Sequence, residues 1–216
     1  MKRRTLPVAT ALAATTCLLL TGCGGGDGSK NQDKIAGADS GDAATSSSPS
    51  PSSGSMDRPD MTLPGDVKET FEGWKTGDAA KGAVLADAGR AQTAVTYAVT
   101  QGNPNSSALA FYQSGSALPG SQDWVKSIAD SDLTYAGPVR YNAVKIGLFN
   151  EKSAAVSYCA DETKAFNRNR KTQKVDRAPP TDDSYVLYST RLELNSKDVW
   201  QTTKLESQRG NKACTA

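Results

Sequence analysis

The hydrophobic pattern of this chain changes its period once, close to Leu133, and this change limits the fold classes open to it. Before that point, apolar residues such as Leu85, Val95 and Ala98 recur at helical spacing. After it, apolar and polar residues alternate, which is typical of strands with one buried face. Helices followed by strands favour an α+β fold, with N-terminal helices packed on one face of an antiparallel sheet.

Capping and turn residues set the expected bounds of the elements. Asp66 followed by Glu69 has the spacing of a capping box, so we expect a short helix to begin there. A longer helix begins at Asp78 and is stopped at Gly102, and two shorter ones follow Ser106 and Ser121. Four strands of a bent meander are then expected, at 141–149, 154–161, 185–194 and 199–207.

Two interruptions are expected within the strand half. Tyr141 is out of phase with the alternating residues that follow it, which indicates a β-bulge near Asn142. Asn150-Glu151-Lys152 is typical of a hairpin turn. The segment 164–177 is polar and is expected to form a loop between strands.

The N-terminal residues predict export. Lys2, Arg3 and Arg4 precede a run without charge from Thr5 to Thr21, which is typical of a secretory signal. The run ends in Leu20-Thr21-Gly22-Cys23, which resembles the lipobox of bacterial lipoproteins. That resemblance implies cleavage before Cys23, acylation of its sulfur and anchoring to membrane lipid on the outer face of the cell membrane. The alternative is an ordinary signal peptide that contains Cys23 by chance.

The chain is expected to have three parts. Residues 1–22 form the signal peptide, and residues 23–65 form the lipidated cysteine and a flexible tether rich in Gly, Ser and Pro. That composition cannot bury enough apolar surface to offset the entropy of ordering. Residues 66–216 form a single α+β domain.

Charge and cysteine usage exclude several classes of function. Without Lys2, Arg3 and Arg4 the chain has 22 basic and 23 acidic residues, so its overall charge does not attract nucleic acid. The chain has no His, which excludes Ser-His-Asp and Cys-His catalysis and His-based zinc sites. Once Cys17 has left with the signal and Cys23 is acylated, two cysteines remain. Cys159 and Cys214 are therefore expected to form a disulfide, with a metal site as the weaker alternative; no cofactor or metal is indicated.

The order of elements also resembles a known superfamily. Helices followed by a long, bent antiparallel sheet are similar to the nuclear transport factor 2-like proteins, which are cone-shaped. Segments 156–162, 184–188 and 199–203, together with Cys214, are similar to a group of actinobacterial secreted lipoproteins of unassigned function. The superfamily contains isomerases, dehydratases, cyclases and binding modules, so the resemblance does not select a function.

The resemblance implies a cavity between the sheet and the helices. A buried carboxyl there, Asp161, could act as a base, or it could instead pair with a Lys or Arg at the sheet surface. No residue is assigned a catalytic role. The polar residues expected to line the cavity are Tyr141, Tyr158, Asp161, Tyr185 and Tyr188.

The loop before the third strand is strongly basic. It could contact an anionic envelope polymer or lipid headgroups, or it could be a solvated loop. Its basic residues are Lys164, Arg168, Arg170, Lys171, Lys174 and Arg177.

Two functions are compatible with these features. The preferred interpretation is a membrane-anchored, non-catalytic binding or accessory module of the cell envelope, with another envelope protein as a further candidate partner. The alternative is a small cavity enzyme of isomerase or cyclase type that uses a carboxylate and a Tyr without His. A carboxyl enclosed beside a Tyr would favour the enzyme.

Overall fold

The computed structural model describes residues 57–215 of the chain. The predicted signal peptide, the acylation site Cys23 and residues 24–56 of the tether lie outside the described residues. Among the residues that are described, no helix combines the length and the apolar character needed to cross a membrane.

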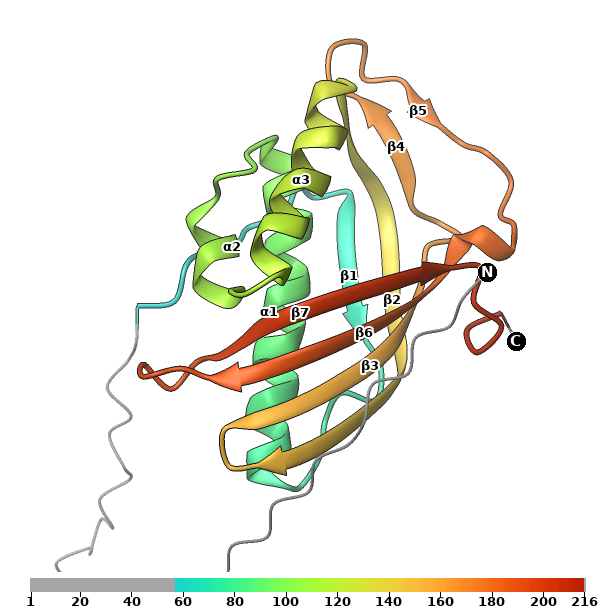
Figure 1. Cartoon of the computed structure of the whole chain (residues 1–216). Helices are drawn as coiled ribbons and strands as arrows, with labels where there is room; N and C mark the ends of the chain where they lie inside the picture. Colours follow the sequence, from blue (N-terminus) through green and yellow to red (C-terminus); the bar gives the residue numbers. More distant parts are fainter. Residues whose placement is uncertain (1–56, 216) are drawn as a thin grey trace, which may run out of the picture. The chain divides into compact units, whose positions relative to one another are not determined.

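Three helices lie on one face of a curved, largely antiparallel sheet, which confirms the predicted α+β class (Figure 1). The sheet has seven strands where four were predicted, in the order β5-β4-β2-β3-β6-β7, with β1 parallel to β2. The elements are β1 (Val67–Phe71), α1 (Ala79–Gln101), α2 (Ser107–Tyr112), α3 (Ala117–Asp130), β2 (Leu133–Asn150), β3 (Ser153–Asp161), β4 (Phe166–Asn169), β5 (Val175–Asp176), a 3-10 turn η1 (Asp182–Ser184), β6 (Tyr185–Leu194) and β7 (Trp200–Arg209).

The segment predicted as the first helix is a strand instead. Residues Val67–Phe71 alternate between buried and exposed positions and pair with Gly137–Tyr141 of β2. Asp66 and Glu69 have the spacing of a capping box, but the backbone hydrogen bonds of this segment go to β2. A pairing partner about 70 residues away in sequence therefore overrides the local helix signal.

Two strands also form inside the predicted polar loop. β4 pairs with the first residues of β2, and β5 pairs with β4. The 164–177 segment lacks a continuous apolar face, so its strands could not be predicted from alternation.

The long helix α1 follows its capping signals closely. The Asp78 carboxylate accepts a hydrogen bond from the Lys81 amide, and Gly102 ends the helix in the left-handed conformation with φ of 65°. The helix packs across the concave face of the sheet (Figure 1). Its buried side meets Tyr158 and Leu192 of the sheet in one apolar cluster.

The strand β2 bends where the sequence predicted a bulge. Its register with β3 shifts between Asn142 and Lys145, and Ala143 has φ of 50°. Gly137 bends the same strand further, with φ of 88°. A Cβ atom at Gly137 would lie 2.1 Å from the carbonyl oxygen of Lys164, so only glycine fits there.

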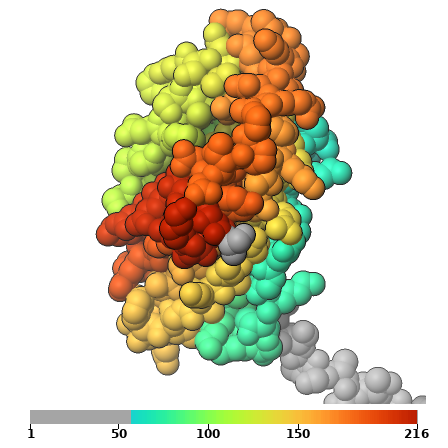
Figure 2. Space-filling view, turned by 90° about the vertical axis from the view of Figure 1, so that its right-hand side faces the viewer, coloured from blue at the N-terminus to red at the C-terminus, as the bar shows by residue number. Residues whose placement is uncertain are grey.

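The predicted disulfide between Cys159 and Cys214 is present, with the two Cα atoms 5.5 Å apart. It joins the C-terminal tail to the face of β3 opposite Tyr158. The tail also holds the segment before β6, since Lys212 bonds Asp182 at 2.6 Å. Figure 2 shows this tail, in dark red, against the orange segment that precedes β6.

Candidate functional site

A cavity of about 830 Å³ lies between α1, α3 and the inner face of the sheet. Its walls combine apolar and polar side chains, with Val95 from α1, Ile128 from α3 and Val139 from β2 among the apolar contributors. The polar side chains gather at two places. One group surrounds Glu69 at the inner wall of β1 and α1, and the other includes Glu162 and Arg209 near the end of the sheet.

The Glu69 carboxylate is held by three hydroxyl groups. Thr93 donates a hydrogen bond to Oε2 at 2.6 Å, and Thr96 donates to Oε1 at 2.6 Å. Tyr141 also donates to Oε1, at 3.2 Å. Strand β1 supplies the carboxylate, α1 supplies both threonines and β2 supplies the tyrosine, so the site forms only when all three elements pack together.

A chain of hydrogen bonds extends this site into the core. The Tyr158 hydroxyl donates to Oε1 of Gln92 at 3.0 Å, and Nε2 of Gln92 donates to the Tyr141 hydroxyl at 3.1 Å. Because Tyr141 then donates to Glu69, every bond in the chain donates toward the carboxylate. The chain therefore stabilises a negative charge at Glu69.

Burial raises the pKa of Glu69, although the hydrogen bonds from Thr93, Thr96 and Tyr141 act in the opposite direction. Burial and the nearby Glu69 carboxyl raise the pKa of Tyr141 well above its usual range. A carboxyl whose pKa is higher in the folded protein binds more protons there than in the unfolded chain. Ionised Glu69 consequently lowers stability at neutral pH, and this cost disappears as the pH falls below the unfolded pKa.

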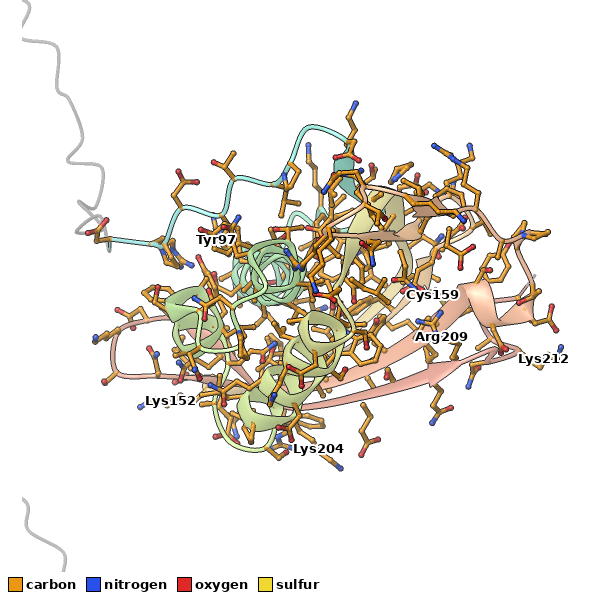
Figure 3. All side chains as sticks on the ribbon, turned by 90° about the horizontal axis from the view of Figure 1, so that it is seen from above. Tyr97, Lys152, Cys159, Lys204, Arg209 and Lys212 are labelled. Carbon is orange, nitrogen blue, oxygen red and sulfur yellow. A yellow bond between two sulfur atoms is a disulfide. The ribbon has the colours of Figure 1, made fainter. Side chains whose placement is uncertain are left out.

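The second polar group lies near the end of β7. Arg209 donates to Glu162 at 2.7 Å and to the backbone oxygen of Asp183 at 2.6 Å, which fixes the segment before β6. Figure 3 shows Arg209 and Lys212 at this end of the sheet. The Tyr135 hydroxyl accepts a hydrogen bond from the Trp124 indole at 2.8 Å. Burial raises the pKa of Tyr135 to about 12, so its hydroxyl stays protonated at neutral pH.

The five residues predicted for the cavity divide into three groups. Tyr141 and Tyr188 line it. Tyr158 is 2% exposed and reaches the site through Gln92. Asp161 and Tyr185 do not line it. The rings of Tyr158 and Tyr188 stack with centroids 5.2 Å apart.

Asp161 is paired at the sheet surface, which was the alternative considered for it. Arg140 donates to its carboxylate at 3.0 Å, and Thr163 donates through both its hydroxyl and its amide. Partial burial acts to raise the pKa of Asp161, but the bonds from Thr163 and Arg140 outweigh it and the pKa is lowered. The hypothesis that Asp161 acts as a base in the cavity is therefore wrong.

Glu69 is the carboxylate that the sequence analysis missed, because it was assigned to a helix cap. The alternation of Val67, Glu69 and Phe71 on one side of a five-residue segment could have revealed it. A carboxylate between two apolar residues on the inner face of a strand is unusual, and such a residue is a candidate for a functional role.

The predicted basic run does not form one surface. Arg170 donates to the backbone oxygens of Val99 and Thr100 near the end of α1, where a cation complements the helix dipole. Lys171 bonds Asp132 at 2.7 Å. A hollow of about 380 Å³ is bordered by Lys164, Arg168 and Arg177, with Arg168 paired to Asp66.

No protein-family model and no curated protein sequence matches this chain. Among solved structures, it is similar to a ketosteroid isomerase-like protein from Erwinia carotovora atroseptica SCRI1043, at 15% identity and a TM-score of 0.40 over 59% of this chain and 93% of that one. It is also similar to the intermembrane space region of the chloroplast protein ARC6, at 13% identity and a TM-score of 0.39 over 62% and 99%. A third is a proposed scytalone dehydratase from Novosphingobium aromaticivorans DSM 12444, at 11% identity and a TM-score of 0.37 over 58% and 83%.

Proposed function

We propose that this chain is a membrane-anchored binding module of the cell envelope whose cavity takes up a small, mainly apolar molecule. The observation that supports this proposal is the cavity itself. Its volume of about 830 Å³ falls within the range of roughly 300–1,000 Å³ that is typical of small-molecule sites. Apolar and aromatic wall residues combined with fixed polar groups are usual in such sites, in which the polar groups orient the ligand.

A second candidate, an enzyme of isomerase or cyclase type, is favoured by one specific observation. Glu69 is a partly buried carboxyl with a raised pKa, and it lies 3.2 Å from the Tyr141 hydroxyl. Such a pair can take a proton from a ligand and donate a hydrogen bond to it. Binding remains the preferred function because the hydrogen bonds from Thr93, Thr96 and Tyr141 counteract the rise in the pKa of this carboxyl and so weaken it as a base.

The anchor is part of the proposal and rests on the sequence Leu20-Thr21-Gly22-Cys23. Replacing Cys23 by Ala should block acylation and the normal cleavage before residue 23, since the thiol that takes the acyl chains would be lost. Fractionation and mass spectrometry of the N-terminal peptide measure this. A Cys17→Ala variant is the matched control and should remain anchored. Acylated, membrane-bound Cys23→Ala protein would contradict the proposal.

A larger side chain that fills part of the cavity should weaken the binding of an apolar probe. Gly120 lines the cavity from α3, and a Cβ atom there would meet no atom within 4 Å, so Gly120→Phe can be accommodated. We expect at least a tenfold loss of affinity for 1-adamantanol, measured by ligand-observed NMR or by Trp fluorescence. The control is Gly82→Phe, since Gly82 belongs to α1 and does not line the cavity. Equal affinities in the two variants would contradict binding in this cavity.

A further inference from the structure

The charges that face the cavity are unbalanced. Its lining contains four carboxylates and one guanidinium, so it is acidic, whereas the whole chain has a formal net charge of +2. Arg209 forms an ion pair with Glu162 at 2.7 Å, and the two charges offset each other. The lining contains no other cation for the remaining three carboxylates. The carboxylates are Glu69, Glu162, Asp176 and Asp183.

Glu69 is the innermost of these carboxylates and lacks a cationic partner. All three of its hydrogen-bond donors are neutral hydroxyl groups. None of the ion pairs found within residues 57–215 includes it. A partly buried charge without a counter-charge is costly, and a ligand that supplies the counter-charge removes that cost.

Aromatic side chains stand around the same cavity. Tyr141 and Tyr188 line it from the sheet, and Trp124 lines it from α3. Aromatic faces attract organic cations, and attraction by several rings together with a carboxylate is typical of sites that bind amines. The acidic lining and the aromatic rings thus favour the same kind of ligand group.

Ser121 adds a further polar group to the same wall. It lies on α3, lines the cavity and is 3% exposed. Its Oγ atom finds no hydrogen-bond partner in the described part of the chain. A buried hydroxyl without a partner is destabilising unless something else in the cavity bonds to it.

We infer that the cavity binds an organic cation, an apolar body with one ammonium group that lies against Glu69. This inference rests on the proposed function, because it names the chemistry of the molecule that the binding module takes up. The ammonium group would bond the carboxylate at the inner wall, and the apolar body would fill the space between α1, α3 and the sheet. An anionic ligand of the same shape is excluded by repulsion from the same carboxylates.

Three probes with one hydrocarbon body test the inference: 1-adamantylammonium, 1-adamantanol and 1-adamantanecarboxylate. We expect the full-length protein to bind the ammonium at least tenfold more tightly than the alcohol, and the carboxylate least tightly. In Glu69→Gln, which keeps the shape of the side chain but removes its charge and one acceptor oxygen, the ammonium should bind no more tightly than the alcohol. Glu151→Gln, an identical change in the exposed turn after β2, should retain the full preference.

The outcomes separate this inference from the proposed function. Equal affinities for the ammonium and the alcohol in the wild-type protein would overturn the inference, but they would not contradict the proposed binding function. An ammonium preference that survives in Glu69→Gln would also overturn it. Failure of all three probes to bind would overturn the binding module and the inference together. Thermal unfolding of Glu69→Gln shows whether it is folded.

Discussion

Replacing Cys159 and Cys214 by Ser together should lower the free energy of unfolding by about 4 kcal/mol. The bond closes a loop with a sequence separation of 55 residues, and the chain-entropy model gives about 4 kcal/mol for a loop of that length. For a domain of this size the loss corresponds to a fall of about 8–16 °C in Tm. Urea denaturation and calorimetry measure the two quantities.

Reduction of the wild-type protein provides the control for this pair. Dithiothreitol should lower the Tm of the wild-type protein to that of the double variant, and it should leave the double variant unchanged. A loss below about 1 kcal/mol would show that the other contacts of the tail suffice. Those contacts include the ion pair of Lys212 with Asp182 and the bond from the Gly210 amide to the Tyr185 oxygen at 2.8 Å.

Replacing Asp87 by Ala should destabilise the protein by about 1–3 kcal/mol, because it removes the acceptor shared by Arg58, Arg90 and Trp200. Asp87 lies in the middle of α1 and is 3% exposed. Its carboxylate bonds Arg58 at 2.5 Å and Arg90 at 3.2 Å, and it accepts the Trp200 amide at 3.0 Å. The alanine variant leaves the buried Trp200 amide without an acceptor, which adds to the loss.

The matched control for Asp87 is Asp130→Ala. Asp130 pairs with Lys126 on the exposed side of α3, with both side chains more than 60% exposed, and such pairs contribute at most about 1 kcal/mol. Urea denaturation of both variants gives the comparison. If Asp87→Ala lowers the free energy of unfolding no more than Asp130→Ala does, the ion pair of Asp87 with Arg58 does not hold the segment before β1 to the domain.

The contacts of Asp87 could not be predicted from local sequence patterns. The sequence analysis did not single out Asp87, and Arg58 lies within residues 23–65, which were assigned to the tether. In the structure these two residues join the segment before β1 to α1, and Asp87 reaches the first residue of β7. No local signal pairs residues that are 29 and 113 positions apart.

Glu69 and Arg170 were missed for a similar reason. A carboxylate three residues after Asp66 has the same spacing in a helix cap and in a strand, and only the pairing of β1 with β2 decides between them. Arg170 was grouped with a surface run, but its guanidinium bonds the backbone oxygens near the end of α1. Sequence patterns describe neighbours along the chain, whereas these roles depend on distant elements that fold against one another.

The sequence alone determined the features that short-range physics controls. Asp78 and Gly102 bounded α1, the alternation of apolar and polar residues after Leu133 predicted strands with one buried face, and the remaining two cysteines predicted the disulfide. Only the tertiary structure decided that Glu69, rather than Asp161, faces the cavity. The position of a side chain relative to a cavity depends on which strands pair and which helix covers them, and those contacts join residues that are far apart in sequence.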